Sequence, residues 1–235
     1  MPAIKSGEQT LPPPMQHLEL LIALVSLMLI QTFLSPDSFL QRAVLNGLFL
    51  VVVLSTIRTL LRSRVRMWTA VTVGSLAYAL SWVGEIRSSL FLVGVIDVCF
   101  IVFFGLLIIG LAESVFGEGP VDANRIIGAV SIFFILGLLW AFIYALLELV
   151  SPGSFRFNAG GAVSTAHSGF VGEFVYFSNV TLTTLGYGDF VPVSALARML
   201  ATLQAMVGQL YIAIIIARMV AIHVSQGRVI DNDDC

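Results

Sequence analysis

Six long apolar runs, each bounded by charged residues, proline or glycine, constrain the fold of this sequence more than any other feature. They cover residues 18–34, 39–57, 67–83, 89–111, 126–149 and 194–223. A helix needs roughly 20 apolar residues to cross a bilayer, so most of these runs are long enough to span one. Only 11% of the 235 residues are charged, against about a quarter in soluble domains. We therefore predict an all-α membrane protein with six transmembrane helices.

A seventh apolar piece, residues 170–184, is too short to cross a bilayer and leads directly into a glycine-rich stretch. Non-helical backbone lies at membrane depth only where protein buries it or where it lines a watery cavity. This pattern predicts a re-entrant segment that begins with a short helix at about 173–183. The C-terminus of that helix carries partial negative charge, which favours a nearby cation.

Two glycines at alternating positions follow this short helix, Gly186 and Gly188. Successive carbonyls point to one side when residues alternate between ordinary and left-handed conformations, and glycine adopts the latter without penalty. A dehydrated cation needs such oxygens in place of its water shell. The carbonyls of Thr184, Leu185, Gly186 and Tyr187, with the Thr184 hydroxyl, are the candidate ligands. One chain offers one such strand, so a complete ring requires several copies around an axis.

The stretch Thr184-Leu185-Gly186-Tyr187-Gly188-Asp189 resembles the selectivity-filter signature of potassium channels. The resemblance includes the short helix before the signature and the apolar run after it. It implies a tetrameric pore built by a homotetramer in the plasma membrane, with K⁺ as permeant ion and no cofactor. The competing interpretation is a glycine turn in a loop, because Gly and Asp also favour turns.

The resemblance also assigns supporting roles to two aromatic residues of the short helix. Tyr176 stands where the family usually has a Trp that bonds the filter Asp, so its hydroxyl is expected to bond Asp189. Phe177 stands at a second frequent Trp position and has no donor for Tyr187.

Gly208, in the last apolar run, resembles the hinge glycine of pore-lining helices and is the gating hinge candidate. It is equally well interpreted as a small residue that lets two helices pack closely. The partner of its neighbour, Gln209, stays open at this stage.

The chain divides into five parts on this interpretation. These are a disordered N-terminal tail (1–17), a four-helix membrane domain (18–112), a linker (113–125), a pore domain (126–223) and a short C-terminal tail (224–235). Asp122 is a plausible cap for the helix that follows the linker.

Basic residues are divided unequally between the two sides if the spans alternate. One side receives Lys5, Arg58, Arg62, Arg64, Arg66, Arg125, Arg218 and Arg228. The other side receives Arg42, Arg87, Arg156 and Arg198. This excess favours cytoplasmic N- and C-termini. The arginines at 58–66 are interpreted as an anchor of this kind, or as contacts to anionic lipid headgroups.

The fourth run, 89–111, contains no Arg or Lys, so we expect weak or no voltage gating. Its single ionisable residue is Asp97, which either pairs with Arg42 or Arg87 or titrates. Glu85, Glu113 and Glu148 lie near predicted helix ends, where we expect water to solvate them.

Two other classes of function stay open. One is a non-conducting or modulatory channel subunit, and the other is a secondary transporter that uses the broken segment as its substrate site. No constellation of His, Cys, Asp or Glu gathers at one depth, so we do not expect an enzyme. The net charge of −2 argues against a nucleic-acid partner.

Overall fold

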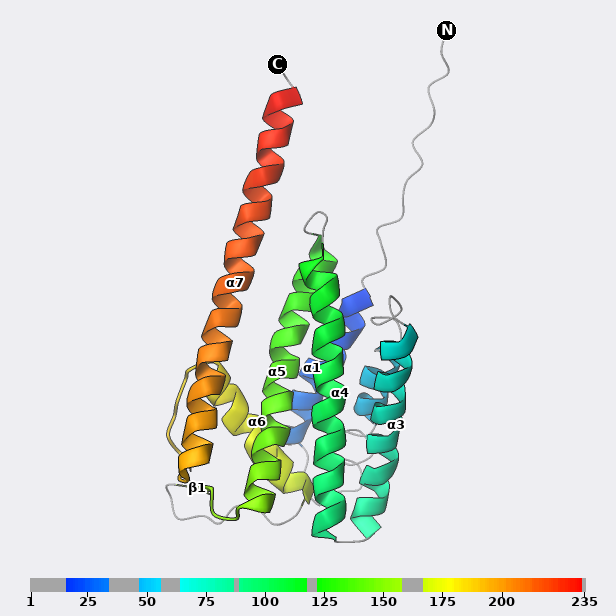
Figure 1. The fold of residues 1–235 in the computed structure, drawn as a ribbon, viewed down its shortest axis with the longest axis vertical. Helices are drawn as coiled ribbons and strands as arrows, with labels where there is room; N and C mark the ends of the chain where they lie inside the picture. The colour runs from blue at the N-terminus through cyan, green and yellow to red at the C-terminus, as the bar shows by residue number, and fades with distance from the viewer. Residues whose placement is uncertain are drawn as a thin grey trace.

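The computed structural model describes residues 16–33, 47–55, 64–86, 89–117, 122–157 and 167–233, and these ranges are mostly helical (Figure 1). The helices are α1 (Gln16–Phe33), a helical stretch at 47–55, α3 (Arg64–Ile86), α4 (Leu90–Phe116), α5 (Ala123–Val150), α6 (His167–Leu182) and α7 (Ala195–Asp233). Two short strands are β1 (Phe155–Phe157) and β2 (Phe190–Pro192). Each of the six predicted runs therefore contains a helix.

Three of the described helices have the length and apolar composition of a membrane span. They are α4, α5 and the Ala195–Arg218 part of α7. The apolar part of α1 is shorter and covers His17–Leu29. Two of these candidate spans thus lie in the second half of the chain, and α4 adds one from the first half.

Local sequence signals explain where the helices of the second half begin. The Asp122 side chain accepts a hydrogen bond from the Arg125 backbone N–H over 2.9 Å, which confirms the predicted cap of α5. Ser194 plays the same role for α7, because its Oγ accepts from the Ala197 N–H over 3.2 Å. α4 ends at Gly117, which has extended backbone.

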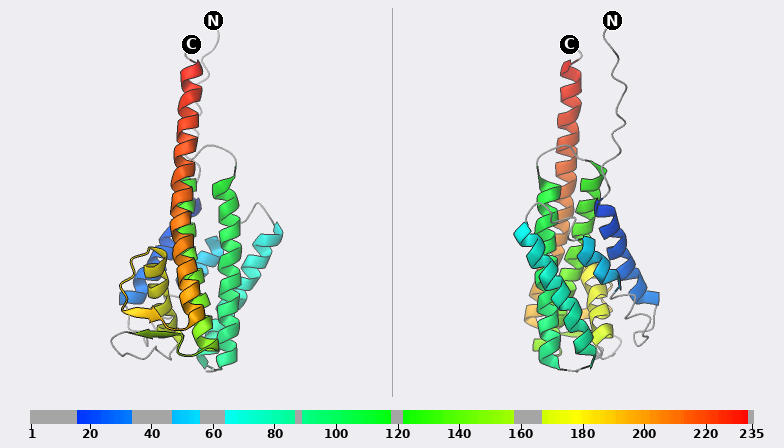
Figure 2. Two further views of the ribbon diagram at one scale, coloured as in Figure 1. Left: turned by 60° about the vertical axis from the view of Figure 1, so that its left-hand side comes forward. Right: turned by 90° about the vertical axis from the view of Figure 1, so that its right-hand side faces the viewer.

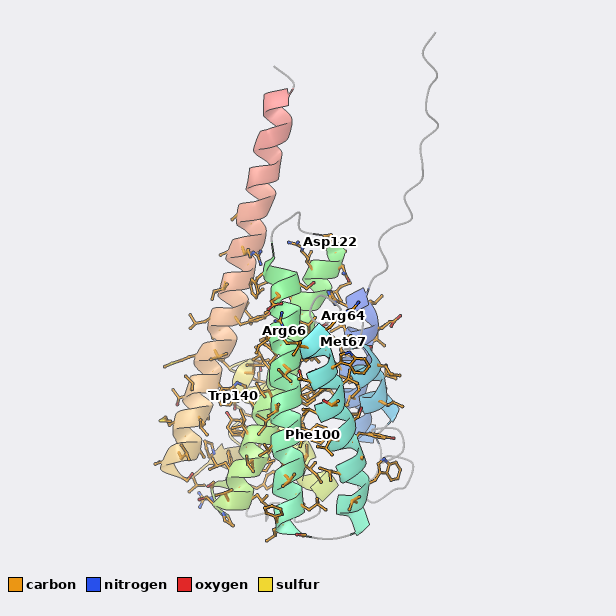
Figure 3. All side chains as sticks on the ribbon, turned by 45° about the vertical axis from the view of Figure 1, so that its right-hand side comes forward. Arg64, Arg66, Met67, Phe100, Asp122 and Trp140 are labelled. Carbon is orange, nitrogen blue, oxygen red and sulfur yellow. The ribbon has the colours of Figure 1, made fainter. Side chains whose placement is uncertain are left out.

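α5 is the central helix, because it packs against α1, α4, α6 and α7 (Figures 1 and 3). Aromatic rings fill its contact with α4, where Phe100 and Phe142 stack with centroids 4.5 Å apart. Phe49, in the helical stretch at 47–55, meets Phe103 of α4 at 5.5 Å. The core is therefore one continuous apolar layer between the two halves of the chain.

One end of the molecule gathers the start of α1, the end of α4 and the start of α5. The His17 N–H donates to Asn124 Oδ1 over 3.1 Å, and Arg66 forms an ion pair with Glu113. Arg218 of α7 donates to the last carbonyls of α4 at this same end. Arg66, which Figure 3 labels, Arg125 and Arg218 thus all contact the last turn of α4 or Gly117 beyond it, as the alternation of helices predicted.

The other end holds α6 and the β1–β2 pair, which is antiparallel with Arg156 opposite Val191. Arg198 lies here too, with its Nε 3.3 Å from the Pro192 carbonyl. In both views of Figure 2, α7 continues well past the other helices, away from this end.

Three features differ from the sequence predictions. The fold is not purely helical, because β1 and β2 pair on either side of the re-entrant segment. α6 begins at His167, ahead of the predicted start at 173. α7 continues to Asp233, so most of the predicted tail at 224–235 is helical. Residues 1–15 of the predicted tail (1–17) lie outside the described residues, and its last two residues begin α1. The basic residues Lys5, Arg42, Arg58, Arg62 and Arg87 also lie outside the described residues.

Candidate ion-conduction site

The short helix α6 lies between α5 and α7, and it occupies only the half of the molecule away from the C-terminal end of α7 (Figure 1). The chain does not continue from α6 into another helix. Instead it folds back along a non-helical stretch, residues 183–189, before β2 begins. This is the re-entrant arrangement that the sequence predicted for the segment.

The backbone N–H groups of this stretch turn back to α6. The Leu185 and Gly186 N–H groups both point to the Val180 carbonyl, at 2.9 and 3.4 Å. The Thr184 N–H donates to the Thr181 carbonyl over 3.0 Å. These bonds satisfy carbonyls at the C-terminus of α6 and hold the donor side of the stretch against the helix.

The backbone conformation alternates along the stretch. Thr184, Gly186 and Gly188 have positive φ angles of 59°, 60° and 76°, whereas Leu185 and Tyr187 do not. The predicted left-handed conformation of the two glycines is confirmed. Thr184 extends the alternation by one position, which the sequence did not predict.

The carbonyl oxygens of residues 184–187 accept no hydrogen bond within the described part of the chain. Because the N–H groups of Thr184, Leu185 and Gly186 are bonded to α6, the carbonyl side of this part of the stretch is the side left available. Residues 183–189 are exposed on the single chain, with Leu185 at 55% and Tyr187 at 66%. The side chains of Leu185 and Tyr187 therefore lack cover from their own chain.

Thr184 is held in an unfavourable backbone conformation. A positive φ in a β-branched residue is a genuine outlier and costs about 1–3 kcal/mol. Its Oγ1 donates to the Thr183 carbonyl over 2.7 Å and accepts from Gln209 Nε2 of α7 over 3.2 Å. These bonds, with that of its N–H, offset the strain.

Asp189 closes the stretch and is bonded to α6. Tyr176 Oη donates to Asp189 Oδ2 over 2.7 Å, which confirms the bond expected from the sequence. This bond, with a second from the Phe190 N–H, lowers the pKa of Asp189. The same bond to the carboxylate raises the pKa of Tyr176 to about 12. The pair therefore stays bonded, with Asp189 ionised, at neutral pH.

Phe177 has a different neighbourhood from the one expected of a filter support. Its ring lies 5.1 Å from that of Tyr144 and 5.5 Å from that of Phe190, both edge-on. Within the described residues it makes no ring contact with Tyr187. Phe177 instead belongs to a buried aromatic cluster of its own chain, which joins α5, α6 and the two strands.

A buried chain of hydrogen bonds joins α5, α7 and α6 beside this cluster. Tyr144 Oη donates to Gln204 Oε1 over 2.6 Å. Gln204 Nε2 donates in turn to the carbonyl and the Oγ of Ser178, at 3.0 and 2.7 Å. Ser178 Oγ completes the chain with a bond of 2.6 Å to the Gly137 carbonyl. Tyr144, Gln204 and Ser178 are completely buried, so these bonds have no competition from water.

Gly208 sits where α7 meets the end of α6. A Cβ on Gly208 would lie only 2.3 Å from the Leu182 carbonyl oxygen, which is closer than any side chain permits. α7 is also a continuous helix through this position. Close packing against α6 therefore explains why position 208 holds a glycine. The hinge role of Gly208 stays a prediction.

One carboxyl group, that of Glu148, differs from what the sequence led us to expect, and the expectation for Asp97 stays a prediction. Glu148 is buried, and its two oxygens accept from the Gly153 and Phe155 N–H groups at 2.7 and 3.0 Å, so the expected solvation by water is wrong. Asp97 is completely buried, and neither oxygen has a hydrogen-bond partner among the described residues. Its predicted partners, Arg42 and Arg87, are outside those residues.

Sequence reasoning missed Tyr144, Ser178 and Gln204. A signal was present for Gln204, because an amide inside an apolar run needs a partner across a helix interface. Among the described residues there is no group of three or more His, Cys, Asp or Glu side chains that would hold a metal ion.

Two apolar helices enclose a short helix and an alternating, carbonyl-rich stretch, an arrangement that could hold a cation in a membrane. A family model described as an ion channel matches residues 132–224, which is less than half of the chain but includes most of α5, all of α6 and most of α7. This segment is therefore similar to an ion channel family. No curated protein and no solved structure matches the chain.

Proposed function

We propose that the chain is one subunit of a homotetrameric, potassium-selective channel of the plasma membrane. Four copies place residues 184–187 around one axis, where their carbonyl oxygens replace the hydration shell of K⁺. The observation that carries the proposal is the alternation of φ at 184, 186 and 188. It occurs beside N–H groups already bonded to α6, so the carbonyls remain for ions.

The exposed positions of the single chain support assembly around an axis. Leu185 and Tyr187 need a neighbour to cover them, and α7 exposes many large apolar side chains. These include Met199, Leu203, Met206 and Leu210. A neighbouring subunit and the lipid are the apolar surroundings that such a surface requires.

The first half of the chain, on this proposal, supplies four further crossings, so that each subunit crosses six times and both termini are cytoplasmic. α4 contains neither Arg nor Lys along its whole length. Charge that moves through the field is what makes a pore respond to voltage. We therefore propose weak or no voltage gating.

The test is ion flux from the full-length protein reconstituted in liposomes under K⁺ and Na⁺ gradients. We expect K⁺ flux that exceeds Na⁺ flux. Gly186→Ala should abolish this preference, because an alanine at φ 60° is strained although nothing lies within 4 Å of its Cβ. Gly105→Ala is the matched control, since it also meets nothing within 4 Å but has no positive φ. Equal permeability for the two ions would overturn the proposal.

A non-conducting or modulatory subunit is the second candidate. The exposed apolar face of α7 would support either candidate. The two candidates differ in which chains the purified complex contains. Mass measurement in detergent separates the two, because a homotetramer contains four chains of 25.4 kDa each and no other chain. A secondary transporter is less well supported, because it requires a matching broken helix in the first half.

A further inference from the structure

Gln209 of α7 makes a side-chain contact with the candidate filter, because its Nε2 lies 3.2 Å from Thr184 Oγ1. The two residues are 25 positions apart in the sequence and belong to different elements. Nothing in the sequence identified this partner. The contact joins the inner helix of the proposed pore to the first oxygen ligand of the filter.

The close approach at Gly208 puts Gln209 within reach. The backbone of α7 at this point lies against the Leu182 carbonyl, with room for no Cβ between them. Thr184 follows Leu182 by two residues, and Gln209 follows Gly208 by one. The backbone contact between Gly208 and Leu182 therefore sets the distance of the hydrogen bond between Gln209 and Thr184.

Thr184 depends on its hydrogen bonds, because residues in strained conformations persist only when their surroundings over-determine them. Its N–H bonds to Thr181 and its hydroxyl proton to the Thr183 carbonyl, both within the same segment. The bond from Gln209 is the one that α7 contributes. Movement of α7 away from α6 thus removes part of what holds Thr184 in place.

The bond from Gln209 also determines which lone pair of the Thr184 hydroxyl oxygen is available to an ion. A threonine hydroxyl has one proton and two lone pairs. The Thr183 carbonyl takes the proton and Gln209 occupies one lone pair, so one lone pair is left for a cation. The direction of that lone pair is fixed as long as Gln209 remains bonded.

We propose that Gln209 is a specificity-determining residue that makes the innermost cation site, the ring formed by Thr184, depend on the position of α7. The proposal rests on the proposed function as a potassium-selective pore. When α7 is seated against α6, Thr184 presents an oriented oxygen. When α7 moves, the bond breaks, Thr184 relaxes, and the site loses its preference for K⁺ over Na⁺.

The test measures the K⁺ to Na⁺ permeability ratio of full-length protein in liposomes, from reversal potentials. Gln209→Leu keeps the bulk of the side chain and removes the donor. We expect the ratio to fall roughly fivefold, as for the loss of one hydrogen bond. Gln209→Asn keeps the amide but is one methylene too short, and we expect a similar fall.

Thr202→Val is the matched control, because among the described residues the Thr202 hydroxyl bonds only to the Arg198 carbonyl of its own helix. We expect its ratio to equal that of the wild type. A purely structural role for Gln209 lowers the amount of assembled channel, and with it the total flux, without changing the ratio.

The outcomes separate this inference from the proposed function. A wild-type protein without ion preference overturns both. A selective wild type together with an unchanged ratio in an assembled Gln209→Leu or Gln209→Asn tetramer overturns the inference alone. If the Leu variant fails to assemble, the Asn variant decides.

Discussion

Arg218 meets Phe116 in two ways at once, as a hydrogen-bond donor and as a cation over a ring. Its Nη2 lies 2.7 Å from the Phe116 carbonyl oxygen, and its Cζ lies 5.0 Å from the centre of the Phe116 ring. The guanidinium also donates to the carbonyls of Val115 and Gly117. These carbonyls form the negative end of α4, so the cation suits the helix dipole as well.

Removal of this guanidinium should loosen α7 from α4. We expect Arg218→Ala to lower the free energy of unfolding by about 1.5–3 kcal/mol, the range for hydrogen bonds to charged groups. Arg218→Lys should lower the free energy of unfolding less, because an ammonium keeps the charge. Some loss should remain, because lysine lacks the planar fork that reaches several carbonyls. Chemical denaturation in detergent measures both. Equal stability of the Ala variant and the wild type would contradict the role of Arg218.

Loss of one hydrogen bond from the buried chain that begins at Tyr144 should lower the free energy of unfolding more than loss of a similar bond elsewhere on α7. Tyr144→Phe leaves the buried Gln204 Oε1 without its donor, and we expect a loss of about 1–3 kcal/mol in the free energy of unfolding.

Tyr211→Phe is the control, because Tyr211 Oη also joins α7 to α5, through a 2.6 Å bond to the Ala129 carbonyl. That carbonyl lies within α5 and keeps its helical partner, so the loss should be smaller. Hydrogen exchange of the α6 amides should increase in Tyr144→Phe and not in Tyr211→Phe. Identical exchange in the two variants would contradict the special role of the chain.

A methyl group at Gly208 should separate α7 from α6. The Leu182 carbonyl is backbone and has little freedom to move, so Gly208→Ala should cost about 1–3 kcal/mol, as for overpacking. Gly105→Ala in α4 meets nothing within 4 Å and should stabilise its helix by about 0.5–1 kcal/mol. Denaturation curves of the two variants should therefore shift in opposite directions. A stable Gly208→Ala protein would show that the two helices are not in contact.

The bond between Tyr176 and Asp189 should determine the pKa of the Asp189 carboxyl group. Because the pKa of Asp189 is lowered in the folded chain, its contribution to stability is present above pH 3.8 and is lost as the pH falls through the lower, folded value. Tyr176→Phe removes the main cause of the shift, so the pKa should rise towards 3.8. Carboxyl ¹³C chemical shifts of Asp189, followed over about pH 2–5, measure the change. Identical titration curves would contradict it.

Much of the site could be predicted because its determinants are local. The spacing of Gly186 and Gly188 gives their left-handed conformation, and Asp122 caps α5 by a rule that spans three residues. Thr184 could not be predicted in the same way. Its residue type disfavours positive φ, and one of the bonds that holds it comes from a residue on another helix.

The partners of buried polar groups were likewise invisible in the sequence. Glu148 lies near the end of α5, where water is the ordinary partner, but the turn to β1 places two backbone N–H groups on it. The extent of α7 beyond residue 223 was missed because apolar runs mark only the part of a helix that lies in an apolar environment. Polar residues continue a helix equally well.

The pairing of β1 with β2 has a consequence for how the protein is built during biosynthesis. The ladder joins Phe155 to Pro192, so the excursion through α6 and the strand behind it is closed at its base within one chain. The entropy lost in closing this loop is therefore lost within a single chain. For the proposed homotetramer, a newly made chain should meet its neighbours with this segment already closed, and assembly should then follow the kinetics of docking between preformed parts.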